Sequence, residues 1–428
     1  MKKIILWSII GFLIAGFAIA GVWWTTRPQV IILKDGTKVT LLGMTYGKHN
    51  VPPKIKFNGR SIRGGGAPID STNDVGVVWI EEQYKGASWS QFQLAVSDPA
   101  NTAATTCWGG SYNDVRHGVE LIGFRLDAFP RRSGKIILRI ISYGSRGQQL
   151  AKGQFTVADP AHGSFPQWPT DPLPNTQTDG DLSVTLNSLD ANAKSPYNRY
   201  NGIPKNDPLN KAVQVDFDVE QNGKPATNWY PIQLIASDAT GNNATAWINE
   251  NNQGNTPTYT FESTLWPNEP AWKLNVEFSR RSGFSQDELW NIPNVPVKPG
   301  TQQDAQQFWD YSNQKKPAFA ETTINGVHLK VYPAIEYSNG QGNWMPGAAN
   351  KVVTIDFHTD PDIDSAGMRM TTMEVTDDQG HKLQQWGSGW GSGNYQYSFA
   401  VTRAMETMNI NVAVHKSRFV EFTVKPMK

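Results

Sequence analysis

The sequence predicts an all-β protein: three tandem immunoglobulin-like antiparallel β-sandwich modules after an N-terminal transmembrane helix. Short alternating apolar runs separated by turn residues predict the sandwiches, and a recurring motif predicts their number. The motif has apolar residues, a small hydroxyl residue, an Asp and, nine or ten residues later, a Trp. Its copies are residues 94–98 with Trp108, residues 234–238 with Trp247, and residues 373–377 with Trp386. The three Asp positions are 140 and 139 residues apart, which predicts one module used three times.

The N-terminal segment predicts a membrane anchor. Residues 4–24 form a nearly unbroken apolar run, and about 20 such residues span a bilayer. Lysines at residues 2–3 orient the N-terminus to the cytoplasm, and Trp23 and Trp24 suit the membrane interface. The alternative is a signal peptide cleaved after the small-residue pattern at 18–20, which would release a secreted protein. Either way, we expect the modules on the extracytoplasmic side of a cell membrane.

Shifts in composition set the module boundaries. Residues 161–180 contain four prolines, which fix φ and remove amide donors, so we expect an extended linker outside any sheet. Residues 301–309 predict a short helix in a second, polar linker. The expected order is anchor or signal peptide (1–28), module one (29–160), Pro-rich linker (161–180), module two (181–299), second linker (300–317) and module three (318–428).

Each module is expected to hold about seven strands. In module one they are residues 30–33, 38–41, 76–80, 92–96, 119–126, 135–141 and 154–157. In module two they are residues 182–186, 212–217, 232–238, 259–261, 272–278 and 294–299. In module three they include residues 327–331, 351–357, 395–401, 408–414 and 422–426. The modules open alike at Gly36, Gly180 and Gly326 and close alike at residues 155–160, 295–299 and 422–426, and Asp35-Gly36 signals a hairpin.

The repeated Trp and Asp have simple structural interpretations. We expect the Trp to fill the core between two sheets, because an indole buries a large apolar area. We expect the Asp to cap a turn by accepting backbone amides.

Composition excludes several classes of function. The net charge is +1, so the chain lacks the basic surface of a nucleic-acid-binding protein. Cys107 is the only cysteine, which rules out an intrachain disulfide and a cysteine-based zinc site. We expect no cofactor.

Three acidic residues form the best candidate for a cation site. Asp360, Asp362 and Asp364 alternate, and calcium prefers clustered oxygen ligands. The EF-hand calcium loop wants Gly at its sixth position and Glu at its twelfth, which this stretch lacks, and the other modules have no equivalent. We therefore expect an acidic turn and no metal.

No catalytic group is expected either. Cys107 and His117 resemble a thiol and its base, but nothing in the sequence activates the thiol, and module two carries Ala246 at the cysteine position. Asp216 and Asp218 share one face of a strand, the arrangement of a carboxylate pair, and a solvent-facing strand edge explains them as well. The prediction is therefore a protein that is not an enzyme.

A Gly- and Ser-rich aromatic stretch at residues 386–397 is the one candidate ligand site. If Trp386 is core, Trp390 has little to bury it, and Asn394, Tyr395 and Tyr397 follow closely. Exposed rings beside amide groups suit stacking on sugar faces, whereas the alternative is a hairpin loop that folds back on its module. The sequence thus predicts a membrane-anchored extracytoplasmic scaffold or protein-interaction protein, and its alternative is a carbohydrate-binding surface protein that uses these four residues.

Overall fold

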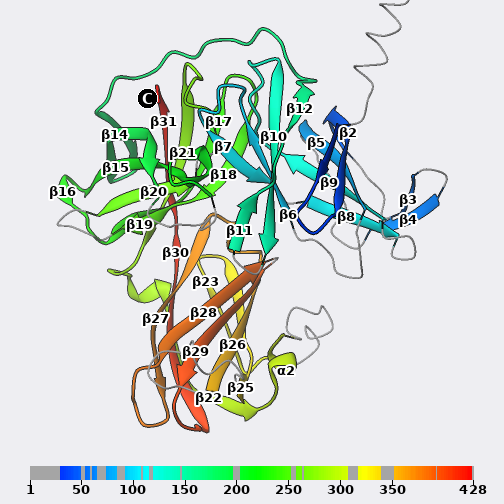
Figure 1. Ribbon diagram of the computed structural model, residues 1–428. Coiled ribbons are helices and arrows are strands. Elements are labelled where there is room, and N and C mark those ends of the chain that lie inside the picture. The colour runs from blue at the N-terminus through cyan, green and yellow to red at the C-terminus, as the bar shows by residue number, and fades with distance from the viewer. Residues whose placement is uncertain are drawn as a thin grey trace, which may run out of the picture.

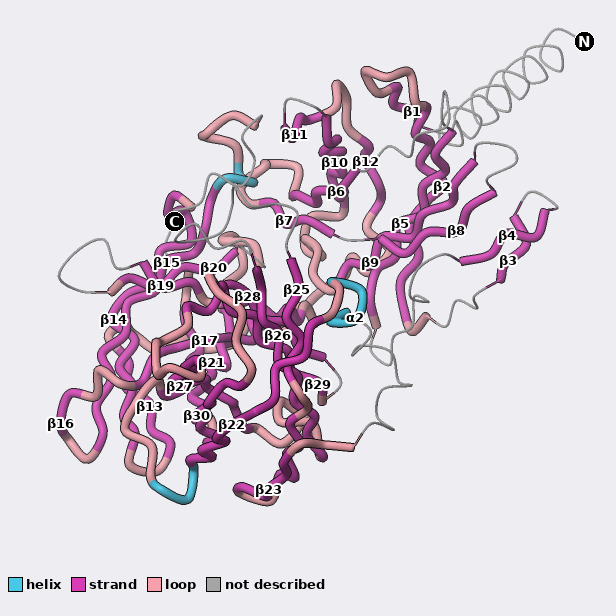
Figure 2. The backbone as a smooth tube through the Cα atoms, turned by 90° about the horizontal axis from the view of Figure 1, so that it is seen from below, coloured by secondary structure: helices cyan, strands magenta, loops and turns pink. Residues whose placement is uncertain are grey.

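The structure is all-β. It is a computed structural model that describes residues 29–426 except 50–53, 58–59, 65–73, 84–91, 108, 115–118, 145–146, 196–202, 252–256, 263–264, 307–316, 339–350 and 392. Strands and loops make up nearly all of the described chain, and helix is confined to short turns (Figure 2). Nearly all strand pairs are antiparallel, so the predicted class of several antiparallel sheets is confirmed.

Module one contains two sheets. The first runs in the order β1 (Gln29–Ile32), β2 (Lys38–Gly47), β5 (Val75–Gln83), β9 (Val119–Leu126), β8 (Gly109–Asp114), β4 (Arg60–Gly64) and β3 (Lys54–Phe57). The second runs in the order β11 (Gly147–Leu150), β10 (Lys135–Gly144), β6 (Phe92–Ser97) and β7 (Ala104–Cys107), and β12 (Phe155–Ala158) also pairs with β10.

Module two also has two sheets. One holds β13 (Asn175–Asp179), β14 (Leu182–Lys194), β15 (Lys211–Gln221), β20 (Thr258–Glu262), β19 (Asn249–Asn251) and, beside β15, β16 (Lys224–Pro225). The other holds β18 (Asn243–Trp247), β17 (Trp229–Asp238), β21 (Trp272–Arg280) and β31 (Arg418–Val424). The turns η1 (Pro208–Asn210) and η2 (Gln286–Glu288) flank strands of this module.

As far as its residues are described, module three is built around one nine-stranded sheet. Its order is β23 (Ala320–Ile324), β24 (Val327–Val331), β26 (Lys351–Asp360), β25 (Ala334–Ser338), β22 (Leu289–Pro299), β30 (Thr407–Lys416) and β27 (Met368–Asp377). β29 (Asn394–Val401) pairs with β26, and β28 (Gln384–Gly391) pairs with β29. The short helix α2 (Gln302–Gln306) lies between β22 and β23 in the chain, inside the segment where a short helix is predicted.

Each module opens with a β-hairpin that has glycine in its turn. β1 pairs with β2, β13 with β14, and β23 with β24. Gly36, Gly180 and Gly326 have φ values of +88°, +60° and +81°, which glycine adopts without the steric cost of a β-carbon. The hairpin predicted around Asp35-Gly36 is therefore confirmed.

The Pro-rich linker is shorter than predicted. Residues 161–174 contain no strand, but residues 175–179 form β13 within the module-two sheet, so the prediction is wrong for them. The reason is that the last proline is Pro174, after which every amide can donate to a neighbouring strand. The Asp171 amide donates to the Thr423 carbonyl at 2.8 Å, which fixes the linker against β31.

The closing strands of modules two and three are exchanged. β22, predicted to close module two, pairs with β30 of module three, whereas β31 pairs with β21 of module two. In that register Leu274 is opposite Phe422, as Leu138 is opposite Phe155 where β12 closes module one. Only Ser417 separates β30 from β31, so one long ribbon passes between the modules (Figure 1). The prediction that residues 422–426 close their own module is wrong, because closing strands of similar pattern fit either sheet.

One apolar core is continuous from module one to module two, and a second fills module three. The first contains Phe129 and Phe155 from module one, Trp272 from module two, and Phe422 from β31. The buried side chain of Asn242 accepts from the Phe129 amide and donates to its carbonyl, each at 3.0 Å. Modules one and two are therefore joined by both apolar and polar contacts.

The membrane anchor lies outside the described part of the chain. Within residues 29–426, as far as they are described, no helix is long and apolar enough to cross a bilayer. Residues 4–24, on which the anchor prediction rests, precede them. The membrane anchor, the immunoglobulin-like fold of the modules and the threefold repeat remain predictions.

Glu82 gives module one a specific pH response. Its side chain on β5 is fully buried, opposite the buried Glu120 on β9, and its carboxylate oxygens have no hydrogen-bond partner among the described residues. Burial and then the neighbouring Glu120 charge raise the pKa of Glu82 from about 4.5 to about 8. At neutral pH Glu82 is thus protonated in the folded state and ionised in the unfolded state.

We expect Glu82→Gln to remove one proton's contribution to the pH dependence of stability. Because the folded state binds the extra proton, that contribution is fully present below pH 4.5 and is lost as pH rises to about 8. Urea unfolding at pH 5 and pH 8 measures it. Glu81 is a half-buried neighbour on β5, so Glu81→Gln is the control. It should leave the difference in unfolding free energy between pH 5 and pH 8 unchanged. If Glu82→Gln also leaves that difference unchanged, the raised pKa of Glu82 is contradicted.

Candidate functional site

The three repeated Asp residues make the same turn. All three are buried, and each carboxylate accepts the amide N–H four residues later. The distances are 2.7 Å from Thr102 to Asp98, 3.3 Å from Asn242 to Asp238 and 2.8 Å from His381 to Asp377. The prediction that these residues cap turns is confirmed.

Two of the three repeated Trp residues do not fill the cores. Trp247 and Trp386 are 48% and 42% exposed, and Trp108 lies outside the described residues. Ala246, which precedes Trp247, is buried on β18, and Cys107 is buried at the same position of β7. Because side chains alternate along a strand, an inward Ala246 turns Trp247 outward. The core prediction is therefore wrong for Trp247 and Trp386.

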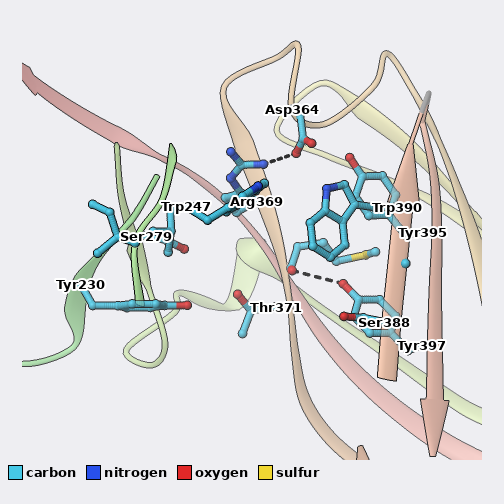
Figure 3. A pocket seen from close by; sticks show the side chains of 14 residues that line it. Tyr230, Trp247, Ser279, Asp364, Arg369, Thr371, Ser388, Trp390, Tyr395 and Tyr397 are labelled. Atoms are coloured by element: carbon cyan, nitrogen blue, oxygen red, sulfur yellow. Dashed lines mark hydrogen bonds and ion pairs between the residues drawn. The ribbon is translucent and has the colours of Figure 1, made fainter. Parts of the chain in front are cut away.

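Trp247 instead lines a cleft between modules two and three. The cleft has a volume of about 330 Å³. Figure 3 shows the side chains that line it. Its module-two lining is Tyr230, Ile232, Trp247, Ile248 and Ser279. Its module-three lining is Asp364, Arg369, Met370, Thr371, Ser388, Gly389, Trp390, Tyr395 and Tyr397. The candidate site therefore belongs to neither module alone.

Two indoles meet at this cleft. The rings of Trp247 and Trp390 lie 5.5 Å apart between centroids at an interplanar angle of 74°, and each side chain is 48% exposed. Trp390 is opposite Tyr395 across β28 and β29, and Ser388 is opposite Tyr397, so these side chains share one face of the sheet. The structure thus brings together three of the four predicted ligand residues.

Asn394, the fourth predicted residue, is not part of the cleft lining. It precedes Tyr395 on β29, so strand alternation turns it to the other face. Its Oδ1 atom lies 3.0 Å from Nδ1 of His358 on β26. Asn394 therefore contacts its own sheet.

The two tyrosines present their rings to the cleft and use their hydroxyl groups within module three. Tyr395 donates to Oδ1 of Asp362 at 3.0 Å, and Tyr397 donates to the Met370 carbonyl at 3.4 Å. Burial raises the pKa of Tyr397 to about 12, and burial together with the Asp364 charge also raises the pKa of Tyr395. Both hydroxyls therefore remain protonated donors at neutral pH.

Arg369 on β27 connects the two modules beside the cleft. Its Nε and Nη2 atoms donate to the two carboxylate oxygens of Glu277 on β21, at 2.7 and 2.6 Å. Its Nη1 atom is paired with Asp364, as Figure 3 shows. Ser417, the residue between β30 and β31, donates to Glu277 at 2.5 Å. Burial raises the pKa of Asp364, and the Arg369 guanidinium opposes that shift.

The acidic stretch is engaged in these contacts. Asp362 accepts from Tyr395, Asp364 pairs with Arg369, and Asp360 is exposed. In the described part of the chain, no three His, Cys, Asp or Glu side chains gather where they could hold a metal ion.

The other candidates for chemistry lie apart from the cleft. Cys107 is buried, and burial raises the pKa of its thiol. His117 lies outside the described residues. Asp218 on β15 accepts from the side-chain amide of Asn187 at 2.9 Å, next to Asp216 on the same strand.

Sequence reasoning missed the module-two side of the cleft. The signal for Trp247 was present, because strand alternation after the small apolar Ala246 places the indole outside. Arg369 gave no signal, since its partner Glu277 is 92 residues away in the chain. Tyr230 gave none either, since the module-three residues that line the cleft with it are distant in the sequence. No protein-family model matches the chain, and a search of curated proteins found none similar to it.

Proposed function

We propose that the protein binds carbohydrate, without catalysis, in the cleft between modules two and three. The observation that carries the proposal is the exposed pair Trp247 and Trp390, held at 74° with hydroxyl groups nearby. A sugar ring has apolar C–H faces that pack on an indole and hydroxyl edges that need polar partners. Ser388 and Thr371 supply such partners beside the aromatic rings.

The size and exposure of the cleft agree with this function. A volume of about 330 Å³ lies at the lower end of ordinary small-molecule sites, which suits a short stretch of a sugar chain. Half-exposed indoles that contact each other across two modules leave apolar area in water that a ligand would cover.

We expect Trp390→Ala to weaken carbohydrate binding by at least about 30-fold, the effect of losing a central aromatic contact. Trp386→Ala is a matched control, because Trp386 is a similarly exposed indole on the same strand but does not line the cleft. A glycan array followed by calorimetry on the bound glycan measures both variants.

Two outcomes would contradict the proposal. Equal losses in Trp390→Ala and Trp386→Ala would mean that the cleft is not the binding site. Turnover of the bound glycan would show an enzyme where a binding protein is proposed.

A scaffold role in the cell envelope is the second candidate. The exchanged strands and the core shared by modules one and two support it, since they join all three modules into a continuous body. Co-purification of one defined protein partner that is unaffected by Trp390→Ala would favour this role.

We also propose that residues 4–24 anchor the chain with its N-terminus in the cytoplasm and its modules outside. The three opening hairpins and the three Asp turns support the proposal that one ancestral module was triplicated. Protease added to intact cells or spheroplasts tests this topology. We expect it to digest the modules and to leave the N-terminus protected.

A further inference from the structure

The charges around the cleft are unequal in number. Arg369 and Asp364 line it, and the carboxylates of Glu277 and Asp362 lie directly behind them. At the module-two side, Arg281 lies over the Tyr230 ring and is itself paired with Glu250 at 2.7 Å. The lining itself therefore holds one acid and one base, and with the groups just named behind and beside it four carboxylates face two guanidinium groups.

The charge of Arg369, the cation at the cleft, is already balanced by carboxylates of the protein. Each of the three nitrogen atoms of Arg369 is paired with a carboxylate, two with Glu277 and one with Asp364. A carboxylate or phosphate on a ligand would therefore meet a guanidinium whose charge is already balanced by two carboxylates, and it would approach like charges in a partly desolvated site.

Asp364 offers the complementary interaction. Its side chain is 35% exposed, so one edge of the carboxylate remains open to the cleft although the other edge is paired with Arg369. Asp364 lines the same cleft as Trp390 and Tyr395, as Figure 3 shows. It is placed to accept a hydrogen bond from the hydroxyl, amide or ammonium group of a sugar stacked on Trp390.

We propose that the cleft takes neutral or amino-substituted sugars and excludes acidic ones, with Asp364 as the specificity-determining residue. This inference rests on the proposed function and names its substrate class. Discrimination comes from the sign of the charge at the ring substituent, whereas the affinity shared by all ligands comes from the aromatic pair.

A glycan panel with neutral, amino-substituted and acidic members tests the inference on the full chain. We expect the members whose binding is lost in Trp390→Ala to be neutral or amino-substituted. Acidic glycans among them, bound as tightly as neutral ones, would overturn this inference and leave the proposed function intact. If no member depends on Trp390, the proposed function itself fails.

Asp364→Asn tests the role of this carboxylate. At low salt the tightest amino-substituted glycan should lose about tenfold in affinity, and the tightest neutral glycan should change little. The amino preference in the unmodified protein should also shrink as salt screens it. Asp360→Asn is the matched control, because Asp360 is exposed on the same acidic stretch and does not line the cleft. An equal loss for both glycans would overturn the role given to Asp364.

Discussion

Truncation of Phe422 to alanine should destabilise the protein by about 3–5 kcal/mol, the usual range for removing a buried aromatic ring. Phe422 belongs to the last strand of the chain, yet it is fully buried in the core shared by modules one and two. Its ring lies 6.1 Å from that of Phe217, and it is opposite Leu274 on β21. The cavity would therefore open in module two and not in module three.

Phe419→Ala on the same strand is the control for this experiment. Phe419 is 45% exposed, so its truncation should change the free energy of unfolding by less than about 0.5 kcal/mol. Urea unfolding followed by tryptophan fluorescence compares the two variants. Similar effects for both would show that β31 does not close module two, which would refute the strand exchange.

Replacement of Arg369 with methionine should also cost about 3–5 kcal/mol, because it leaves a buried carboxylate without its partner. The Glu277 side chain is only 6% exposed, and each of its carboxylate oxygens accepts a hydrogen bond from Arg369. The double change Arg369→Met with Glu277→Leu removes both charges, and we expect it to recover most of the lost stability.

Lys273→Ala is the matched control for the ion pair. Lys273 also connects β21 to a neighbouring strand, through Glu421 at 3.1 Å, but the two side chains are 39% and 50% exposed. Its loss should cost no more than about 1 kcal/mol. A loss for Arg369→Met within that range would show that the pair contributes little to the contact between modules two and three.

The sequence predicted the features that depend on neighbouring residues. Strand class, the hairpin at Asp35-Gly36 and the capping role of Asp98 and its two equivalents all follow from local pattern. For Trp390 the Gly- and Ser-rich segment left two alternatives open, an exposed indole or a loop folded back on its own module, and the structure has the indole exposed.

The predictions that were wrong concern residues and strands whose partners are distant in the chain. Trp247 was predicted to face the core because an indole has a large apolar area. The alternation of side chains along β18 instead places Ala246 in the core and Trp247 outside it. The exchange of β22 and β31 has no local signature, since either strand satisfies the pattern of a closing edge. Local pattern could therefore place Trp247 outside its own core but could not place it against Trp390 of module three.

The position of β31 also sets an order of events during synthesis. Domains generally fold as they leave the ribosome, with the N-terminal ones first. Module two cannot do so, because one of its sheets lacks an edge until residues 418–424 have been made. Translation must therefore pass residue 424 before module two reaches its native state, and a chain that stops before β31 would leave an earlier module incomplete.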